Sequence, residues 1–202
     1  MKFKYIKEID TVIIDGFYSK DQLADIKTEI NNLNKPYIMK RAGIDIGSST
    51  EKTTNKLGTS KLGVFLENHY RSNLMEKCSL VKCTRNNIIS QPVLTKLFKI
   101  NPFFKIIYSD HIKASHLLSY YEDGDFYREH TDASVFTLFA YFNTDKYTGG
   151  DLIVHSFDKK TKINIESKNG RVVIFPGCSV HEVTDVKGKG RYCYSLFFNI
   201  NN

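Results

Sequence analysis

Two residues near the middle of the chain, His130 and Asp132, have the types and the spacing of metal ligands. In a β-strand, residues i and i+2 point to the same face, so these two side chains would project together while Thr131 points away. A neutral imidazole and a carboxylate that converge on one point belong to the 2-His-1-carboxylate ligand set of iron(II) sites. The pair alone is a weak signal, because most His-x-Asp pairs are coincidental.

A further candidate ligand and a carboxylate-binding group follow later in the chain. His181 lies 51 residues after His130, directly behind an apolar run and a Pro-Gly turn, and Arg191 opens the last apolar run ten residues further on. A guanidinium is permanently charged and can bind a carboxylate through two parallel hydrogen bonds. By itself, a histidine in this position is more often a turn histidine than a metal ligand. Together the four residues predict an iron site with a carboxylate-binding arginine beside it.

Short β-rich runs must position these residues. From about residue 107 the chain contains IKASHLLSYY, SVFTLFAYF, DLIVHSF, RVVIF and RYCYSLFFNI, the last of which begins at Arg191. Turn signals separate the runs, including Gly149-Gly150, which we interpret as a strand bend, and Pro176-Gly177. Many short strands at this spacing predict an antiparallel sandwich or barrel.

The N-terminal half has helical signals. Residues 11–14 predict a short strand, and Ser19 followed by Gln22 is a capping box at the start of a helix. Apolar residues then recur at helical spacing as far as residue 33. A second helix is expected to begin at Ser90, with Pro92 in its first turn. The fold class is therefore α+β and mainly β, with the N-terminal helices packed on a β unit.

Residues 41–63 are rich in Gly, Ser, Thr and Lys, and this composition predicts a long loop. Long loops in compact domains are usually either functional or disordered. The segment is our candidate for a lid over the site.

The charge distribution and the cysteine spacing give only weak signals of another function. Residues 35–105 carry 13 Lys/Arg and 4 Asp/Glu within a chain of net charge +7, so an anionic partner such as nucleic acid is conceivable. Lysines outnumber arginines 23 to 6, whereas phosphate and base recognition usually draws on arginine. The four cysteines form no CxxC pair and are expected to be reduced thiols.

No apolar run is long enough to span a membrane, and the start of the chain has no secretory apolar region. We expect no membrane association and a cytoplasmic location.

The motifs around the candidate ligands resemble a known family. YYEDGDFYREHTD, DKYTGGDLIV and FPGCSVHEVTDVKGKGR occur in the order found in iron(II)/2-oxoglutarate dioxygenases of the prolyl 4-hydroxylase-like branch. The chain is especially similar to the PKHD-type hydroxylases. The resemblance covers residues 115–200, and VIIDGFYSKDQLADI is similar to the family's opening strand and helix, whereas residues 35–105 match nothing we can name.

The resemblance implies a double-stranded β-helix, or jelly roll, in a single domain of residues 1–202. Residues 1–106 would be the helical and loop part, and residues 107–202 the catalytic core. The implied site residues are the iron ligands His130, Asp132 and His181, the 2-oxoglutarate contacts Arg191, Tyr121 and Tyr141, and Tyr127 toward the substrate. Relatives often have Trp near the last strand, where this chain has Phe197 and Phe198.

The implied reaction is hydroxylation of an unactivated C–H bond with Fe²⁺, 2-oxoglutarate and O₂, which releases succinate and CO₂. Ascorbate is a further candidate cofactor. The expected substrate is a prolyl residue of a peptide or protein. The alternatives are an oxygenase acting on nucleic acid or on a free amino acid, or a catalytically inactive binding module of the same fold. Dealkylating relatives carry a second arginine at the position of Phe197, so its absence here disfavours nucleic acid.

Overall fold

The computed structural model describes residues 1–41, 61–71 and 73–200. Its helices are α1 (Lys20–Leu33), α2 (Leu66–His69), α3 (Ser79–Ile88) and α4 (Gln91–Ile100), with the 3-10 helices η1 (Lys7–Ile9), η3 (Met75–Lys77) and η4 (Pro102–Tyr108). The strands of the large sheet are β1 (Lys2–Ile6), β2 (Thr11–Asp15), β3 (Lys40–Arg41), β4 (Leu62–Phe65), β5 (Ile112–Tyr121), β7 (Phe136–Asn143), β11 (Val172–Pro176) and β14 (Arg191–Ile200). The remaining strands are β6 (Tyr127–His130), β8 (Tyr147–Gly149), β9 (Leu152–His155), β10 (Lys162–Ile165), β12 (His181–Val183) and β13 (Val186–Gly188).

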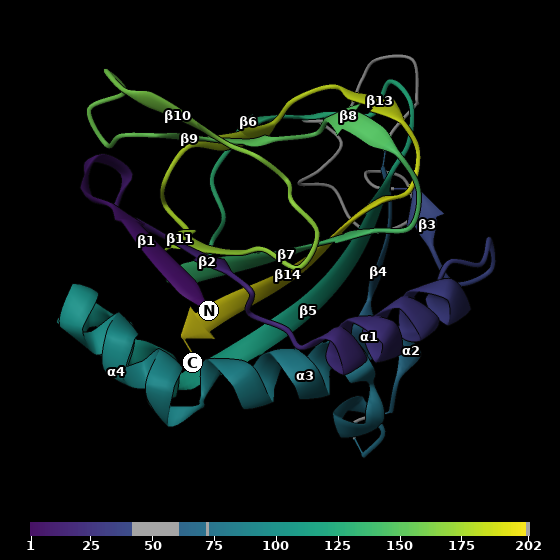
Figure 1. Cartoon of the computed structure of the whole chain (residues 1–202), viewed down its shortest axis with the longest axis horizontal. Helices are drawn as coiled ribbons and strands as arrows, with labels where there is room; N and C mark the ends of the chain where they lie inside the picture. Colours follow the sequence, from purple (N-terminus) through teal and green to yellow (C-terminus); the bar gives the residue numbers. More distant parts are fainter. Residues whose placement is uncertain (42–60, 72, 201–202) are drawn as a thin grey trace.

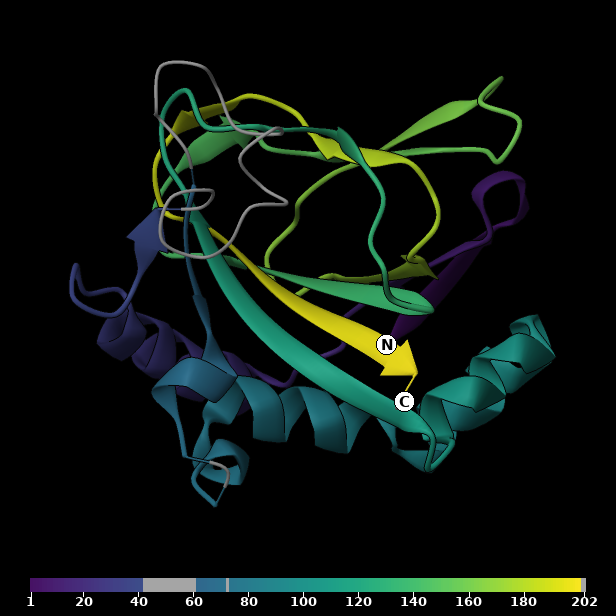
Figure 2. The same cartoon turned by 180° about the vertical axis from the view of Figure 1, so that it is seen from behind.

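Two antiparallel sheets face each other. The large sheet has the order β1-β2-β11-β7-β14-β5-β4-β3, and the small sheet has the order β10-β9-β12-β6. Figure 1 shows α1, α3 and α4 as a layer under the large sheet, with the small sheet on the opposite side. The view from behind in Figure 2 shows the same layers. This mainly β, jelly-roll architecture with helices packed on one side confirms the predicted fold class. The N-terminal part is not only helix and loop, because β1 to β4 complete the large sheet.

Strands β2, β7, β11 and β14 of the large sheet are buried on both faces. Two cores share strand β7. Phe139 and Tyr141 belong to the core between the two sheets, and the residues that face the core between the large sheet and the helices are Phe136, Leu138, Ala140 and Phe142. Strands buried on both faces read as continuous apolar runs. The run SVFTLFAYF could therefore be recognised as a strand from the sequence, but not which of its side chains faces the barrel.

Two of the helices begin as predicted. Ser19 Oγ accepts a hydrogen bond from the Gln22 backbone N–H at 3.1 Å, and Gln22 Oε1 accepts one from the Ser19 N–H at 2.9 Å. The second helix, α4, follows Ser90 and has a proline in its first turn. Helix α3 was missed by the sequence analysis. Its cap residue, Cys78, makes no side-chain hydrogen bond to the helix, so the usual polar start signal is absent.

The predicted loop over residues 41–63 differs from the structure at its edges. Arg41 is the end of β3, and Leu62 begins β4, which pairs with β5. Residues 42–60 lie outside the described residues, so the lid stays a prediction. Strand β4 forms because Leu62 to Phe65 pair with the end of β5, and β3 in turn pairs with β4. The local composition does not reveal such a long-range partner.

The cysteines are free, with Cys78, Cys83 and Cys193 buried and Cys178 exposed. Among the described residues, no helix combines the length and the apolar character that crossing a bilayer requires.

Candidate metal centre and the adjoining cavity

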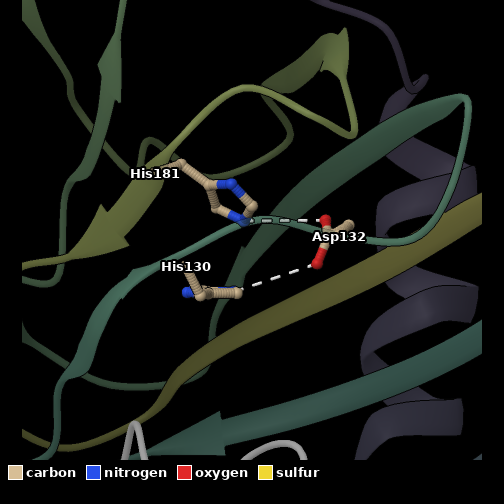
Figure 3. A group of neighbouring side chains, drawn as sticks. All are labelled: His130, Asp132 and His181. Carbon is tan, nitrogen blue, oxygen red and sulfur yellow. Dashed lines mark ion pairs between the residues drawn. The ribbon is translucent and has the colours of Figure 1, made fainter. Parts of the chain in front are cut away.

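Strands β6 and β12 bring two histidines together. They pair antiparallel, with His130 directly opposite His181, and the two imidazole ring centroids lie 4.3 Å apart. Asp132 completes the group: its Oδ1 lies 3.9 Å from His130 Nε2 and its Oδ2 lies 3.6 Å from His181 Nε2. Figure 3 shows both imidazoles directed toward the carboxylate. The structure thus assembles one possible ligand atom from each of the three predicted residues at a single point.

Asp132 reaches this point by a different route from the predicted one. Strand β6 ends at His130, so the assumption of an extended strand through Asp132 was wrong. Instead, the Asp132 backbone N–H donates to the Gly177 carbonyl at 2.8 Å. A Cβ on Gly177 would lie 2.1 Å from the Ser134 carbonyl oxygen, so only glycine lets the two turns approach this closely. The convergence therefore depends on contact between the 132–134 turn and the Pro-Gly turn.

Both histidines are held in the tautomer that a metal requires. His130 Nδ1 lies 2.7 Å from the Arg128 carbonyl, and His181 Nδ1 lies 2.9 Å from the Ser179 carbonyl. A carbonyl can only accept, so each Nδ1 carries the proton and donates it. Each Nε2 is left with its lone pair, as is usual for metal-bound histidines oriented by an outer hydrogen bond.

Burial also sets the charges of the group. It lowers the pKa of His130 and of His181 to about 4, so both imidazoles are neutral at pH 7. It raises the pKa of Asp132, because a carboxylate without a cation is disfavoured in this environment. Within the described part of the chain, His181 Nε2 is buried and has no hydrogen-bond partner. Two neutral imidazoles and a carboxylate are a donor set for a divalent metal ion, and such an ion would also be the partner that His181 Nε2 lacks. The residues therefore fit the implied iron.

Thr137 orients the carboxylate, since its buried Oγ1–H donates to Asp132 Oδ2 at 2.6 Å. We expect Thr137→Val, which keeps the shape and removes the donor, to weaken Mn²⁺ binding by about 10- to 100-fold, the usual effect of losing an outer-shell partner. Titration calorimetry measures this. Thr11→Val is the matched control, because buried Thr11 Oγ1 donates to the Ile9 carbonyl, away from the site. Equal affinities in the two variants would contradict this role.

Arg191 is fully buried at the start of β14. Its Nε donates to the Gly150 carbonyl at 2.8 Å, whereas both terminal nitrogens are buried without a hydrogen-bond partner among the described residues. Its Cζ lies 4.4 Å from the ring centroid of Tyr121 and 5.4 Å from that of Tyr141. The Tyr141 hydroxyl is also buried and has no hydrogen-bond partner in residues 1–41, 61–71 and 73–200. A fixed guanidinium and a phenol with unused hydrogen-bonding capacity fit a carboxylate ligand.

The register of the large sheet explains this grouping. Arg191 pairs with Tyr121 on β5, and Cys193 pairs with Tyr141 on β7. Because directly paired residues share a face, all four side chains point into the space between the sheets.

A cavity of about 120 Å³ adjoins the candidate metal ligands. His130 and Asp132 form part of its wall, and so does Tyr127, whose ring centroid is 4.0 Å from that of His130. The other lining residues are Lys61, Phe65, Leu117, Tyr121, Phe139, Val183, Cys193, Ser195 and Phe197. The residue predicted to face the substrate therefore contacts a candidate ligand and borders an internal space.

The sequence analysis missed several residues of this region. Cys193 and Ser195 follow Arg191 at the two-residue spacing of a strand, and this periodicity could have revealed them. Gly150 was interpreted as a strand bend, yet its carbonyl also anchors Arg191. Lys61 stands in a lysine-rich segment, where nothing distinguishes it from its neighbours. Asp125 is also buried, and its carboxylate accepts from the Glu122 N–H at 3.0 Å.

A second group of possible ligands lies on the same small sheet, at Glu129 of β6, His155 of β9 and Glu182 of β12. Glu129 and Glu182 directly adjoin His130 and His181, so they face the opposite side of the small sheet. Lys162 Nζ lies 3.0 Å from Glu129 Oε1, and His155 Nε2 lies 3.3 Å from the same oxygen. Lys162 Nζ also lies 4.0 Å from Glu182 Oε1, so both carboxylates already have a cationic partner, while His155 itself is buried.

Comparisons with known proteins agree with this geometry. Residues 115–199 match the family model of the 2OG-Fe(II) oxygenase superfamily. None of the curated proteins shows significant sequence similarity to the chain. A prolyl-4-hydroxylase from Pseudomonas putida is 15% identical with a TM-score of 0.63, over 95% of this chain and 93% of that one.

Other solved structures share the fold. A prolyl hydroxylase from Trichoplax adhaerens, in complex with a hypoxia inducible factor oxygen degradation domain peptide fragment, is 13% identical with a TM-score of 0.68, over 96% of this chain and 84% of that one. A dioxygenase for auxin oxidation from Arabidopsis thaliana is also 13% identical, with a TM-score of 0.65, over 97% of this chain and 85% of that one. The stated resemblance is confirmed: residues 115–199 match the family model of the 2OG-Fe(II) oxygenase superfamily, and the fold of the chain is that of the prolyl 4-hydroxylase-like structures.

Proposed function

We propose that this chain is an iron(II)- and 2-oxoglutarate-dependent dioxygenase that hydroxylates an unactivated C–H bond and releases succinate and CO₂. One observation supports this most strongly. Three candidate ligand atoms lie within 4.8 Å of one another. The barrel that holds them also holds a buried arginine, two of whose nitrogens have no hydrogen-bond partner among the described residues. A buried cation without a partner is costly, so its retention is best explained by an anionic ligand.

In this proposal each residue has a defined task. His130, Asp132 and His181 hold the iron, which supplies the redox chemistry of oxygen activation when bound. Arg191 binds the distal carboxylate of 2-oxoglutarate through its two free nitrogens. The Tyr141 hydroxyl donates to the same carboxylate, and the Tyr121 ring keeps the guanidinium in place. Apolar and aromatic cavity residues exclude water around the reacting groups. Residues 1–202 would work as one domain.

The proposed substrate is a prolyl residue of a peptide or protein. The prolyl hydroxylase fold of the similar structures supports this, and the Trichoplax adhaerens structure contains a peptide fragment. The auxin-oxidising structure shows that the same fold also carries a different activity. A peptide-library incubation read by mass spectrometry tests the proposal, because hydroxylation adds about 16 Da, the mass of one oxygen atom. A gain confined to other residues, or seen only with free amino acids, would replace the prolyl assignment.

Conversion of 2-oxoglutarate to succinate tests the reaction class. With Fe²⁺, O₂ and 2-oxoglutarate, the wild-type chain is expected to form succinate, and Asp132→Ala is expected to form none above the protein-free background. Parallel reactions with and without ascorbate test it as an additional cofactor. Equal succinate formation by the two proteins would mean that Asp132 does not hold the metal.

A further inference from the structure

Lys61 is a buried lysine in the wall of the cavity. It directly precedes β4, is 5% exposed, and borders the same 120 Å³ space as His130 and Asp132. Its Nζ lies 4.0 Å from the ring centroid of Tyr127 and 5.5 Å from that of Tyr121. Its contacts in the described structure are thus aromatic faces. A lysine ammonium is strongly hydrated, so its burial in this place needs an explanation.

The aromatic contacts do not replace the lost water. Cation–π attraction recovers only part of the hydration energy of a buried ammonium. Asp132 and Asp125 act on the amine through space, but no carboxylate in the described residues lies at ion-pair distance from it. Burial lowers the pKa of Lys61 to about 8, so most of the amine is still charged at pH 7. In the part of the chain that the structure describes, a charged donor therefore borders the cavity without an anion at ion-pair distance.

Lys61 and Arg191 flank one aromatic ring. Arg191 Cζ lies 4.4 Å and Lys61 Nζ lies 5.5 Å from the centroid of the Tyr121 ring. The two buried cationic groups are therefore less than 10 Å apart. Their mutual repulsion disfavours this arrangement unless anions separate them. A five-carbon dicarboxylate carries two such anions at its ends. Lys61 lines the same cavity as the candidate metal ligands His130 and Asp132. Of the two carboxylates of such a molecule, Lys61 would therefore contact the one nearer the metal.

We propose that Lys61 binds the carboxylate of 2-oxoglutarate that is adjacent to the keto group, while Arg191 binds the distal one. This rests on the proposed function. Lys61 is then a specificity-determining contact: it neutralises the carboxylate at the metal end and favours 2-oxo acids over neutral molecules of the same shape.

Titration calorimetry of 2-oxoglutarate into Mn²⁺-loaded protein tests this assignment. Lys61→Met keeps the length of the side chain and removes the charge, and we expect it to weaken 2-oxoglutarate binding about tenfold or more, the scale of a charged hydrogen bond. Lys61→Arg is expected to retain most of the affinity. Lys96→Met is the matched control, because Lys96 is exposed and its Nζ lies over the Phe3 ring at 5.9 Å, on the surface.

A second ligand identifies the carboxylate. 2-Oxopentanoate keeps the keto acid and lacks the distal carboxylate, so Lys61→Met should weaken its binding by the same factor as for 2-oxoglutarate. Unchanged 2-oxoglutarate affinity in the variant overturns the role of Lys61, and a loss confined to 2-oxoglutarate overturns its assignment to the keto end. Absence of binding by the folded wild type would instead refute the proposed function. Thermal unfolding checks each variant, and Lys61→Gln replaces Lys61→Met if the latter does not fold.

Discussion

His130→Ala is expected to abolish succinate formation and to weaken Mn²⁺ binding by about a hundredfold or more. Removal of an outer-shell partner alone costs about 10- to 100-fold in metal affinity, and removal of a ligand costs more. His130 is half-buried and its Nδ1 is already hydrogen-bonded to the Arg128 carbonyl, so its Nε2 is the atom directed at the site. Calorimetry with Mn²⁺ and a succinate assay measure the two effects separately.

Glu129→Ala is the control for this experiment. Glu129 is the preceding residue of β6, is exposed, and pairs with Lys162 on the outer side of the small sheet. Loss of a surface ion pair costs at most about 1 kcal/mol, so the fold should persist. Metal affinity and turnover should stay within about twofold of the wild type. If His130→Ala and Glu129→Ala behaved alike, the convergence of the three residues would have no functional meaning.

Arg191→Met is expected to weaken 2-oxoglutarate binding by about a hundredfold, because losing one partner of a buried charge pair costs about 2–5 kcal/mol. Mn²⁺ affinity should be unchanged, since Arg191 is not among the grouped candidate ligands. The unfolding temperature of the free protein should not fall, because an uncompensated buried charge is replaced by an apolar side chain. Calorimetry and thermal unfolding test the three statements. A simultaneous loss of metal binding would show that the substitution disturbs the whole site.

Gly150→Ala tests the same arginine without removing it. A Cβ at Gly150 would lie 2.5 Å from both Cδ and Nε of Arg191, and the φ angle of +65° adds backbone strain. Gly124→Ala is the matched control, because its φ is +85° and a Cβ there meets nothing within 4 Å. Both variants should lose about 1–2 kcal/mol of stability from the left-handed backbone. Only Gly150→Ala should also weaken 2-oxoglutarate binding.

The sequence by itself determined the candidate ligands, the arginine and the fold class. His130 and Asp132 stand two residues apart, and the motif around His181 and Arg191 is a continuous segment, so short-range spacing was enough to recognise them. The capping box at Ser19 and the apolar runs of the strands are local signals in the same sense. Helix α3 escaped because its cap residue, Cys78, lacks a polar side chain that bonds the helix end.

Only the tertiary structure decided how these residues are held and what else lies beside them. Asp132 reaches the histidines through a turn closed by Gly177, and the face of β14 that carries Arg191 follows from its pairing with β5 and β7. Lys61 comes to the site from a segment more than 60 residues away along the chain from His130. The charge of a lysine is visible in any sequence, but its meaning depends on burial, and burial is created by residues that only folding brings together.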